Sequence, residues 1–136
     1  MKRTLLALTI AACGMGSLST AQAVALNPDG LGQVLIFPYY TVNGGLTTLL
    51  SVASNSDRGK IVQVTFREAY NGGSTIDFNL FLSAYDVWTG AVFSLDASGP
   101  ANLLTDDKSC TAPDLRAFGN NVLSDGRHYQ PFRNYE

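Results

Sequence analysis

The sequence contains few of the side chains that build metal centres and nucleophile–base pairs. Its 136 residues include one histidine and two cysteines. A zinc site takes three or four ligands, which one imidazole and one thiol supply only with several carboxylates. His128 is the sole imidazole, and no Gly-x-Ser-x-Gly elbow is present to expose a serine. We therefore expect a chain that is not an enzyme, without catalytic residues, bound metal or cofactor.

Carboxylates are the remaining side chains that support chemistry, and they are scattered. Glu68 and Asp86 are the candidates for glycoside hydrolysis, which needs an acid in an apolar cleft and a second carboxylate. The sequence identifies a partner for neither. A calcium site is an alternative, with the loop carboxylates of Asp96, Asp106, Asp107 and Asp114 as ligands. Their spacing, however, matches no EF-hand loop.

Positive charge is also scarce, with nine basic residues against eleven acidic ones. If Lys2 and Arg3 leave with a signal peptide, the net charge is about −4. No basic stripe is present to neutralise phosphates, so nucleic acid is not expected as a partner. After the N-terminal segment, no run approaches the 18 apolar residues of a membrane helix, so none is expected in the mature chain.

The first 23 residues have the pattern of a cleaved secretory signal. Two basic residues precede an apolar run, and the small-x-small sequence Ala21-Gln22-Ala23 follows it. Cleavage between Ala23 and Val24 predicts a periplasmic or extracellular protein. The alternative is a lipobox around Cys13, whose modification would anchor the chain to a membrane.

Cys110 is alone once Cys13 is removed with the signal. A single cysteine in a secreted protein suggests a free thiol, an intermolecular partner or a partner in missing sequence. The chain also stops within an aromatic stretch at Glu136. Both observations favour a fragment of a longer protein with a disulfide partner for Cys110 outside this sequence. The alternative is a natural last strand that closes the fold.

Period-two alternation dominates the chain after the signal. Val62, Val64 and Phe66 alternate with polar residues, as on a half-buried strand. Asn43-Gly44-Gly45 and Asn71-Gly72-Gly73 predict tight turns. The expected strands are Gln33 to Thr41, Leu46 to Ala53, Lys60 to Tyr70, Thr75 to Ser83, Ala91 to Leu95 and Ala101 to Thr105.

Short strands at intervals of about ten residues, with no helical period between them, indicate an all-β fold. We predict an antiparallel immunoglobulin-like β-sandwich over residues 24–105, with a small β-barrel as the alternative. Residues 1–23 are the signal peptide. Residues 106–136 are expected to be loop-rich, with a further strand over His128 to Tyr135.

Aromatic residues are the main candidates for ligand binding. Tyr39, Tyr40 and Tyr85 could stack on sugars, whereas core packing is the commoner use of aromatics in a small sandwich. Trp88 is expected in the core, as the single large anchor of the sandwich.

Several segments resemble a family of uncharacterised secreted proteins from Gram-negative bacteria. They are Leu26 to Gln33 running into Leu35 to Thr41, then Asp77 to Leu80, Leu82-Ser83, Tyr85 to Thr89 and Asp107 to Thr111. The resemblance covers about residues 26–113, and Ala84 stands where its pattern has proline. It implies export and an N-terminal β-sandwich in a longer protein, and it transfers no catalytic residue.

We therefore expect an exported, non-enzymatic β-sandwich module with a structural or adhesive role at the cell envelope or outside the cell. Its expected partners are envelope proteins or glycans. A carbohydrate- or ligand-binding module is the first alternative, and a fragment of a larger secreted hydrolase is the second. Fold alone does not separate these roles.

Overall fold

The computed structural model describes residue 29, residues 31–117 and residues 121–133. The expected signal peptide, with Cys13 and the Ala23–Val24 cleavage site, lies outside the described residues. The chain divides into two units, one ending at Ile36 and one beginning at Phe37. The described part of the first unit has no strand, and its apolar side chains from Leu31 to Ile36 are exposed. The strands below all belong to the second unit.

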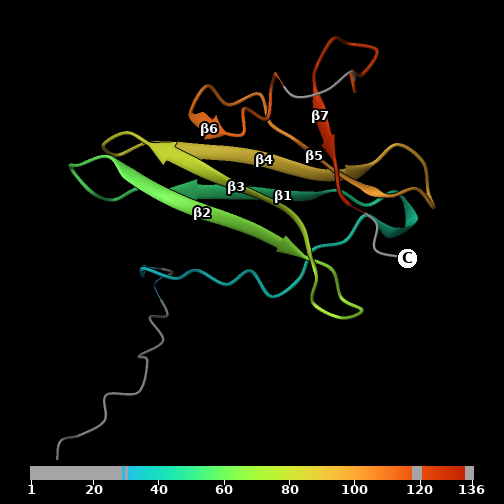
Figure 1. Ribbon diagram of the computed structural model, residues 1–136, viewed down its shortest axis with the longest axis horizontal. Coiled ribbons are helices and arrows are strands. Elements are labelled where there is room, and N and C mark those ends of the chain that lie inside the picture. Colours follow the sequence, from blue (N-terminus) through green and yellow to red (C-terminus); the bar gives the residue numbers. More distant parts are fainter. Residues whose placement is uncertain (1–28, 30, 118–120, 134–136) are drawn as a thin grey trace, which may run out of the picture. The chain divides into compact units, whose positions relative to one another are not determined.

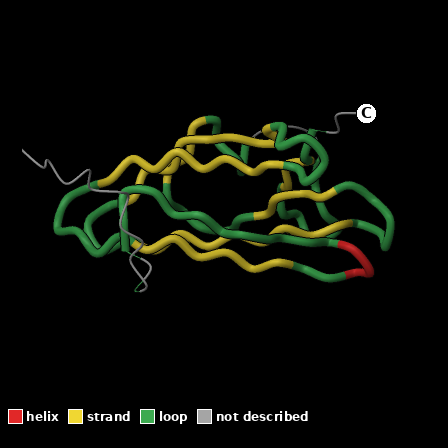
Figure 2. Tube along the Cα trace, turned by 90° about the horizontal axis from the view of Figure 1, so that it is seen from below, coloured by secondary structure: helices red, strands yellow, loops and turns green. Residues whose placement is uncertain are grey.

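The second unit contains two antiparallel sheets and a short 3-10 turn, η1, at Asn43–Gly45 (Figure 1). The strands are β1 (Thr48–Ala53), β2 (Lys60–Arg67), β3 (Ser74–Leu82), β4 (Val87–Ser94), β5 (Ala101–Leu104), β6 (Cys110–Ala112) and β7 (Tyr129–Pro131). One sheet has the order β1-β4-β5-β7 and the other β2-β3-β6, and they form separate layers in Figure 2. Among the described residues no helix is long and apolar enough to span a bilayer.

Each sheet contributes its apolar face to one shared core. The alternation predicted for β3 is confirmed, since Phe78, Leu80 and Leu82 are buried while Asp77 and Asn79 are exposed. The same holds for β2, where Phe66 is buried and its polar neighbours are exposed. The buried residues of the core are Val52, Phe66, Phe78, Leu80, Leu82, Trp88, Val92, Leu103, Leu115 and Phe132. Two antiparallel sheets over one core are the arrangement of a β-sandwich, and they do not close into the barrel kept as the alternative.

Trp88 is at the centre of this core, as expected from the sequence. Its side chain is 0% exposed, and its ring centroid lies 5.7 Å from that of Phe78 on the facing sheet. Gly90, two residues further along β4, leaves room for the indole. A Cβ built on Gly90 would lie 2.6 Å from the Cη2 atom of Trp88. The Trp88 ring and Gly90, which has no side chain, therefore form one packing unit.

The strand pairing is nested. β1 pairs with β4, from Thr48 opposite Val92 to Ala53 opposite Val87, while β2 and β3 pair with each other on the other sheet. The tight turn at Asn71-Gly72-Gly73 joins β2 to β3, and Gly72 has the positive φ of 77° expected there. Both the β3–β4 and the β5–β6 connections pass from one sheet to the other.

The strand expected over Gln33 to Thr41 is wrong, because no strand occurs between residues 31 and 47. Pro38 has no N–H to donate to a ladder, which interrupts pairing in the middle of the segment. The turn predicted at Asn43-Gly44-Gly45 is present, with φ of 67° at Gly44 and 79° at Gly45. It forms a 3-10 turn rather than a hairpin, since no strand precedes it.

The sheets extend beyond the domain limit of residue 105 that the sequence suggested. β6 joins the three-stranded sheet, and β7 joins the four-stranded sheet within the predicted His128 to Tyr135 strand. Leu115 and Phe132 from the same segment are buried in the core. The sequence gives little sign of this contribution, because both core side chains lie outside the short strands β6 and β7. The last residues, 134–136, lie outside the described part.

Candidate functional site

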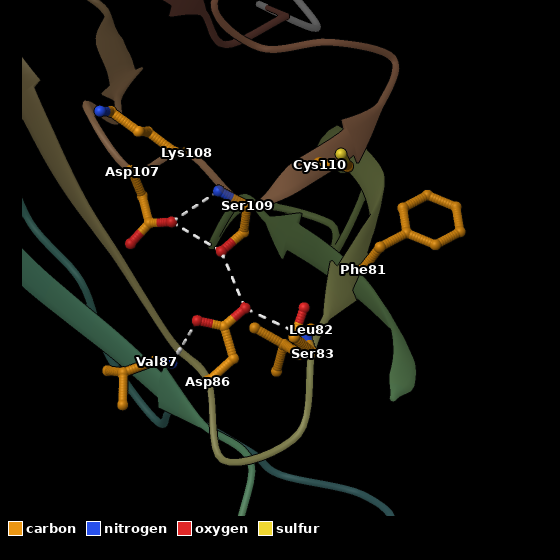
Figure 3. Close-up of a pocket in the computed structure, with 9 residues that line it drawn as sticks. All are labelled: Phe81, Leu82, Ser83, Asp86, Val87, Asp107, Lys108, Ser109 and Cys110. Carbon is orange, nitrogen blue, oxygen red and sulfur yellow. Dashed lines mark hydrogen bonds between the residues drawn. The ribbon is translucent and has the colours of Figure 1, made fainter. Parts of the chain in front are cut away.

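A cavity of about 400 Å³ lies where the β3–β4 and β5–β6 connections meet (Figure 3). It is lined by Phe81, Leu82, Ser83, Asp86, Val87, Asp107, Lys108, Ser109 and Cys110. We call this the Asp86–Asp107 site. The lining comes from the end of β3, the β3–β4 turn, the β5–β6 connection and the start of β6. Residues 81–87 and 107–110, which are far apart in sequence, therefore meet at one place.

Asp86 holds the β3–β4 turn. One carboxylate oxygen accepts the N–H of Ser83 at 3.1 Å, and the other accepts the N–H of Val87 at 2.9 Å. Asp86 also joins the neighbouring loop, because its carbonyl accepts the N–H of Ser54 at 2.8 Å. Tyr85 has a φ of 54°, a left-handed conformation that only a few non-glycine residues adopt. A short turn between two sheets is thus stabilised by one carboxylate.

Asp107 does the same for the β5–β6 connection. Its carboxylate accepts the N–H of Ser109 at 2.8 Å, the hydroxyl of Ser109 at 2.6 Å and the N–H of Thr89 at 3.3 Å. The N–H of Asp107 donates to the hydroxyl of Thr105, which in turn donates to the carbonyl of Thr89 at 2.7 Å. These contacts attach the connection to β4.

Ser109 bridges the two carboxylates, as Figure 3 shows. Its hydroxyl lies 2.6 Å from Asp107 and 3.4 Å from Asp86. A serine hydroxyl has one proton to donate, so the short contact to Asp107 is the stronger bond. The Ser109 hydroxyl therefore lies between the carboxylates of the β3–β4 and β5–β6 connections, with its proton directed to Asp107.

The pKa of Asp107 lies below its ordinary value. Partial burial favours the neutral form and raises the pKa, but the hydroxyl and N–H of Ser109 and the N–H of Thr89 stabilise the charge. The guanidinium of Arg116 adds a smaller favourable field. These bonds outweigh the burial, so the fold favours the charged form of Asp107.

This lowered pKa predicts how stability responds to acid. A carboxylate whose pKa is depressed on folding stabilises the fold above its unfolded pKa, about 3.9, and loses that effect as pH falls through the folded value. We expect Asp107→Asn to lower the free energy of unfolding at pH 7 by about 1–2 kcal/mol. We also expect the variant to lose less stability than the parent between about pH 5 and pH 2. Urea unfolding followed by circular dichroism at several pH values measures both effects.

Asp57→Asn is the matched control, because Asp57 is an exposed aspartate of the β1–β2 loop. It should change neither quantity by more than about 0.5 kcal/mol. A pH profile of Asp107→Asn parallel to that of the parent would contradict the role of the Asp107 charge.

The carboxylates of the site are engaged by backbone N–H groups rather than paired with an imidazole. His128 is not among the lining residues, and it forms an isolated bridge with Val122. Within the described ranges, no three His, Cys, Asp or Glu side chains gather closely enough to hold a metal ion. The loop aspartates considered for calcium are therefore not assembled into a ligand set. Asp96, for example, accepts the N–H of Ser98 in the β4–β5 turn.

Glu68, the other candidate acid, lies at the far end of β3 from Asp86. Its carboxylate accepts the N–H groups of Tyr70, Asn71 and Gly73 in the β2–β3 turn. These bonds, that from Gly73 foremost, hold the pKa of Glu68 below its ordinary value. The two carboxylates considered for glycoside chemistry therefore close two different turns.

Cys110 begins β6, opposite Phe81 in the register, instead of lying in the polar loop expected from sequence. Its thiol is free in the described chain, and the residue is exposed. A disulfide to a cysteine in missing sequence stays a prediction.

The three tyrosines proposed for ligand stacking are not brought together. Tyr40 packs edge-on against Phe66 and Phe132, and its hydroxyl donates to the carbonyl of Arg67. Tyr85 is at the opposite end of β3, where its N–H donates to the carbonyl of Ser56. Tyr39 is 73% exposed. Tyr40 lines a second cavity.

That second cavity has a volume of about 430 Å³. It is lined by Tyr40, Glu68, Thr75, Ser98, Gly99, Pro100, Ala101, Phe132 and Arg133. The pKa of Tyr40 is raised, mainly because the side chain is partly buried. A hydrogen bond with Thr75 lowers the pKa, and the negative charge of Glu68 raises it. We call this the Tyr40 cavity.

Comparison with known proteins does not extend these observations. The chain matches no known family model, no curated protein and no solved structure. The functional argument therefore rests on the residues themselves.

Sequence reasoning singled out Asp86 and Asp107 but not the bridge between them. The Asp-Lys-Ser spacing at 107–109 is a local signal, because an aspartate often accepts the N–H two residues further on. That spacing predicts the turn. It does not predict the contact of Ser109 with Asp86, 23 residues earlier.

Proposed function

We propose that the chain is an exported, non-enzymatic β-sandwich module with a structural or adhesive role at the cell envelope or outside the cell. One observation carries the proposal. At the Asp86–Asp107 site, the carboxylates accept backbone N–H groups of the β3–β4 and β5–β6 connections and of the adjoining strand β4. Carboxylates bound in this way hold a fold in place, and no imidazole is among the lining residues to form a nucleophile–base pair.

Export is supported by the sequence of residues 1–23 and by the resemblance to secreted proteins. A basic start, an apolar run and cleavage between Ala23 and Val24 lead to a periplasmic or extracellular chain. Lipid attachment at Cys13 remains the alternative proposal. The expected partners of such a module are envelope proteins.

The immunoglobulin-like type of the sandwich stays a prediction. The division into four and three strands is that of a constant-type immunoglobulin domain. The order β1-β4-β5-β7 differs from that type, in which the first strand pairs with the second.

The test combines the intact mass of the native protein with its activity. Cells are fractionated, and the mass of the purified protein is measured along with hydrolysis of ester, peptide and glycoside substrates. The expected result is a protein in the periplasmic or secreted fraction whose mass corresponds to a chain starting at Val24. This protein should hydrolyse none of the substrates. Turnover that Asp86→Asn abolishes would overturn the proposal in favour of a hydrolase.

A second candidate function is carbohydrate binding, and the Tyr40 cavity favours it. The aromatic residues Tyr40 and Phe132 line one hollow of about 430 Å³ together with the polar residues Ser98, Glu68 and Arg133. Aromatic rings with a few convergent polar groups are typical of small-molecule sites.

If this cavity binds sugars, calorimetric titration with glucose, galactose, N-acetylglucosamine and their β-linked disaccharides should detect binding. Arg133→Ala should then weaken it by about tenfold or more, since a charge-assisted hydrogen bond is lost. Tyr85→Ala is the control, because Tyr85 lies at the other end of β3. No heat from any sugar, or equal effects of both substitutions, would rule out this site.

A further inference from the structure

The edge strands of the two sheets differ sharply in how they are protected. An unpaired edge offers a row of N–H and C=O groups to another chain, and proteins block it with short strands, proline, charge or bulges. β6 and β7 are edges of three residues each. β7 ends at Pro131, and Pro113 directly follows β6. Both edges are therefore too short and too interrupted to add a strand.

β2 is a long edge of eight residues, but charge and an irregularity protect it. Lys60 begins the strand, Arg67 ends it, and the pairing register shifts between Phe66 and Arg67. Antiparallel pairing of β2 with its own copy would bring the Lys60 end of one chain beside the Arg67 end of the other. Like charges placed opposite each other are unfavourable across a strand pair.

β1 has none of these features. Its six residues, Thr-Leu-Leu-Ser-Val-Ala, contain no charge, proline or glycine, and its pairing with β4 runs without a register shift. Leu49 on its outer face is 79% exposed, and Leu50 on its inner face is only partly buried. The hydrogen bonds between Thr41 and Thr48 use the side-chain hydroxyl of Thr48. Within the described residues, no second strand pairs with the outer edge of β1, and no backbone–backbone hydrogen bond joins residues 37–47 to it.

We propose that β1 pairs antiparallel with β1 of a second copy of this chain, about a twofold axis at Ser51. The four-stranded sheets of the two copies then form one continuous sheet. Residues opposite each other across a strand pair point to the same face. With Ser51 opposite its own copy, Leu49 lies opposite Ala53 on the outer face, and Leu50 lies opposite Val52 on the inner face.

This register explains why a second copy is the partner. It buries Leu49 against the partner's small Ala53 and brings apolar side chains together at the partly open core edge around Leu50. Because β1 carries no charged residue, the pairing places no like charges of the two strands opposite each other. The inference rests on the proposed structural role and names a partner for it, whereas its test measures assembly alone and is independent of turnover or location.

The first test is sedimentation velocity of the purified chain over a concentration series. We expect a dimer that forms with increasing concentration. Ser51→Lys should restore the monomer mass, because it places two ammonium groups opposite each other at the twofold axis. Thr65→Lys is the matched control, an exposed residue on the outer face of edge strand β2, and should leave the dimer intact. Circular dichroism confirms that both variants fold.

The second test traps the register directly. Ser51→Cys in a Cys110→Ser background should form a disulfide-linked dimer on mild oxidation, since the Cα atoms of opposite residues lie within disulfide range. Thr65→Cys in the same background should stay monomeric on reducing-agent-free gels. A parent chain that remains monomeric at all concentrations would overturn the proposal. A dimer that Thr65→Lys disrupts as readily as Ser51→Lys, or a failure of Ser51→Cys to cross-link, would overturn it as well.

Discussion

Trp88→Ala is expected to lower the free energy of unfolding by about 3–5 kcal/mol, the largest loss from any single truncation in this chain. The side chain is fully buried between the sheets and contacts Phe78 across the core. Alanine would leave a cavity that the surrounding strands cannot collapse into, because both sheets are fixed by their ladders. Urea unfolding followed by circular dichroism measures the change, since the protein has no other tryptophan to report it.

Two controls separate the lost volume from other effects. Trp88→Phe removes an indole Nε1 that is buried without a hydrogen-bond partner, so part of the lost packing is offset. We expect it to be less than half as destabilising as Trp88→Ala. Val87→Ala, on the outer side of the same strand, should change stability by about 0.5 kcal/mol or less. A Trp88→Ala variant within 1 kcal/mol of the parent would show that the core is not organised around this ring.

Gly90→Ala is expected to destabilise the protein by about 1–3 kcal/mol although it adds only one methyl group. The new Cβ would lie 2.6 Å from the Cη2 atom of Trp88, closer than packed carbon atoms approach. The indole would have to move within a core that is filled on its other side by Phe78. The same unfolding measurement detects this loss.

A double-mutant cycle isolates the clash between the two residues. In a Trp88→Ala background, Gly90→Ala should be nearly neutral, because the atoms that it would meet are gone. Gly59→Ala is a control, since its Cβ would lie 3.4 Å from the carbonyl of Leu82, an ordinary contact distance. If the effects of Trp88→Ala and Gly90→Ala simply add, the packing unit described here does not exist.

Much of the sandwich could be predicted because strands record their buried face in every second residue. Phe78, Leu80 and Leu82 alternate with polar residues along β3, and that alternation identified both the strand and its orientation. The turn at Asn71-Gly72-Gly73 marked its start. The core position of Trp88 followed from size and apolar character alone.

The remaining features depend on contacts between distant segments. The segment around Tyr39 has the composition of a strand, but Pro38 interrupts its hydrogen bonding, and no ladder forms. Tyr40 and Tyr85 were grouped by residue type, whereas the sheet places them at opposite ends of β3. Ser109 meets Asp86 only because two crossing connections lie at the same end of the sandwich. No local pattern encodes such a meeting.

The nested pairing of the strands also determines an order of folding. β2 and β3 are joined by a short turn, so their hairpin can close at a small entropic penalty as soon as both are synthesised. β1 must wait for β4, its partner from Thr48 opposite Val92 onwards, and the hairpin forms in between. Such non-local pairing is slow. During synthesis, therefore, we expect uncharged β1 to be the described strand that stays longest without its partner.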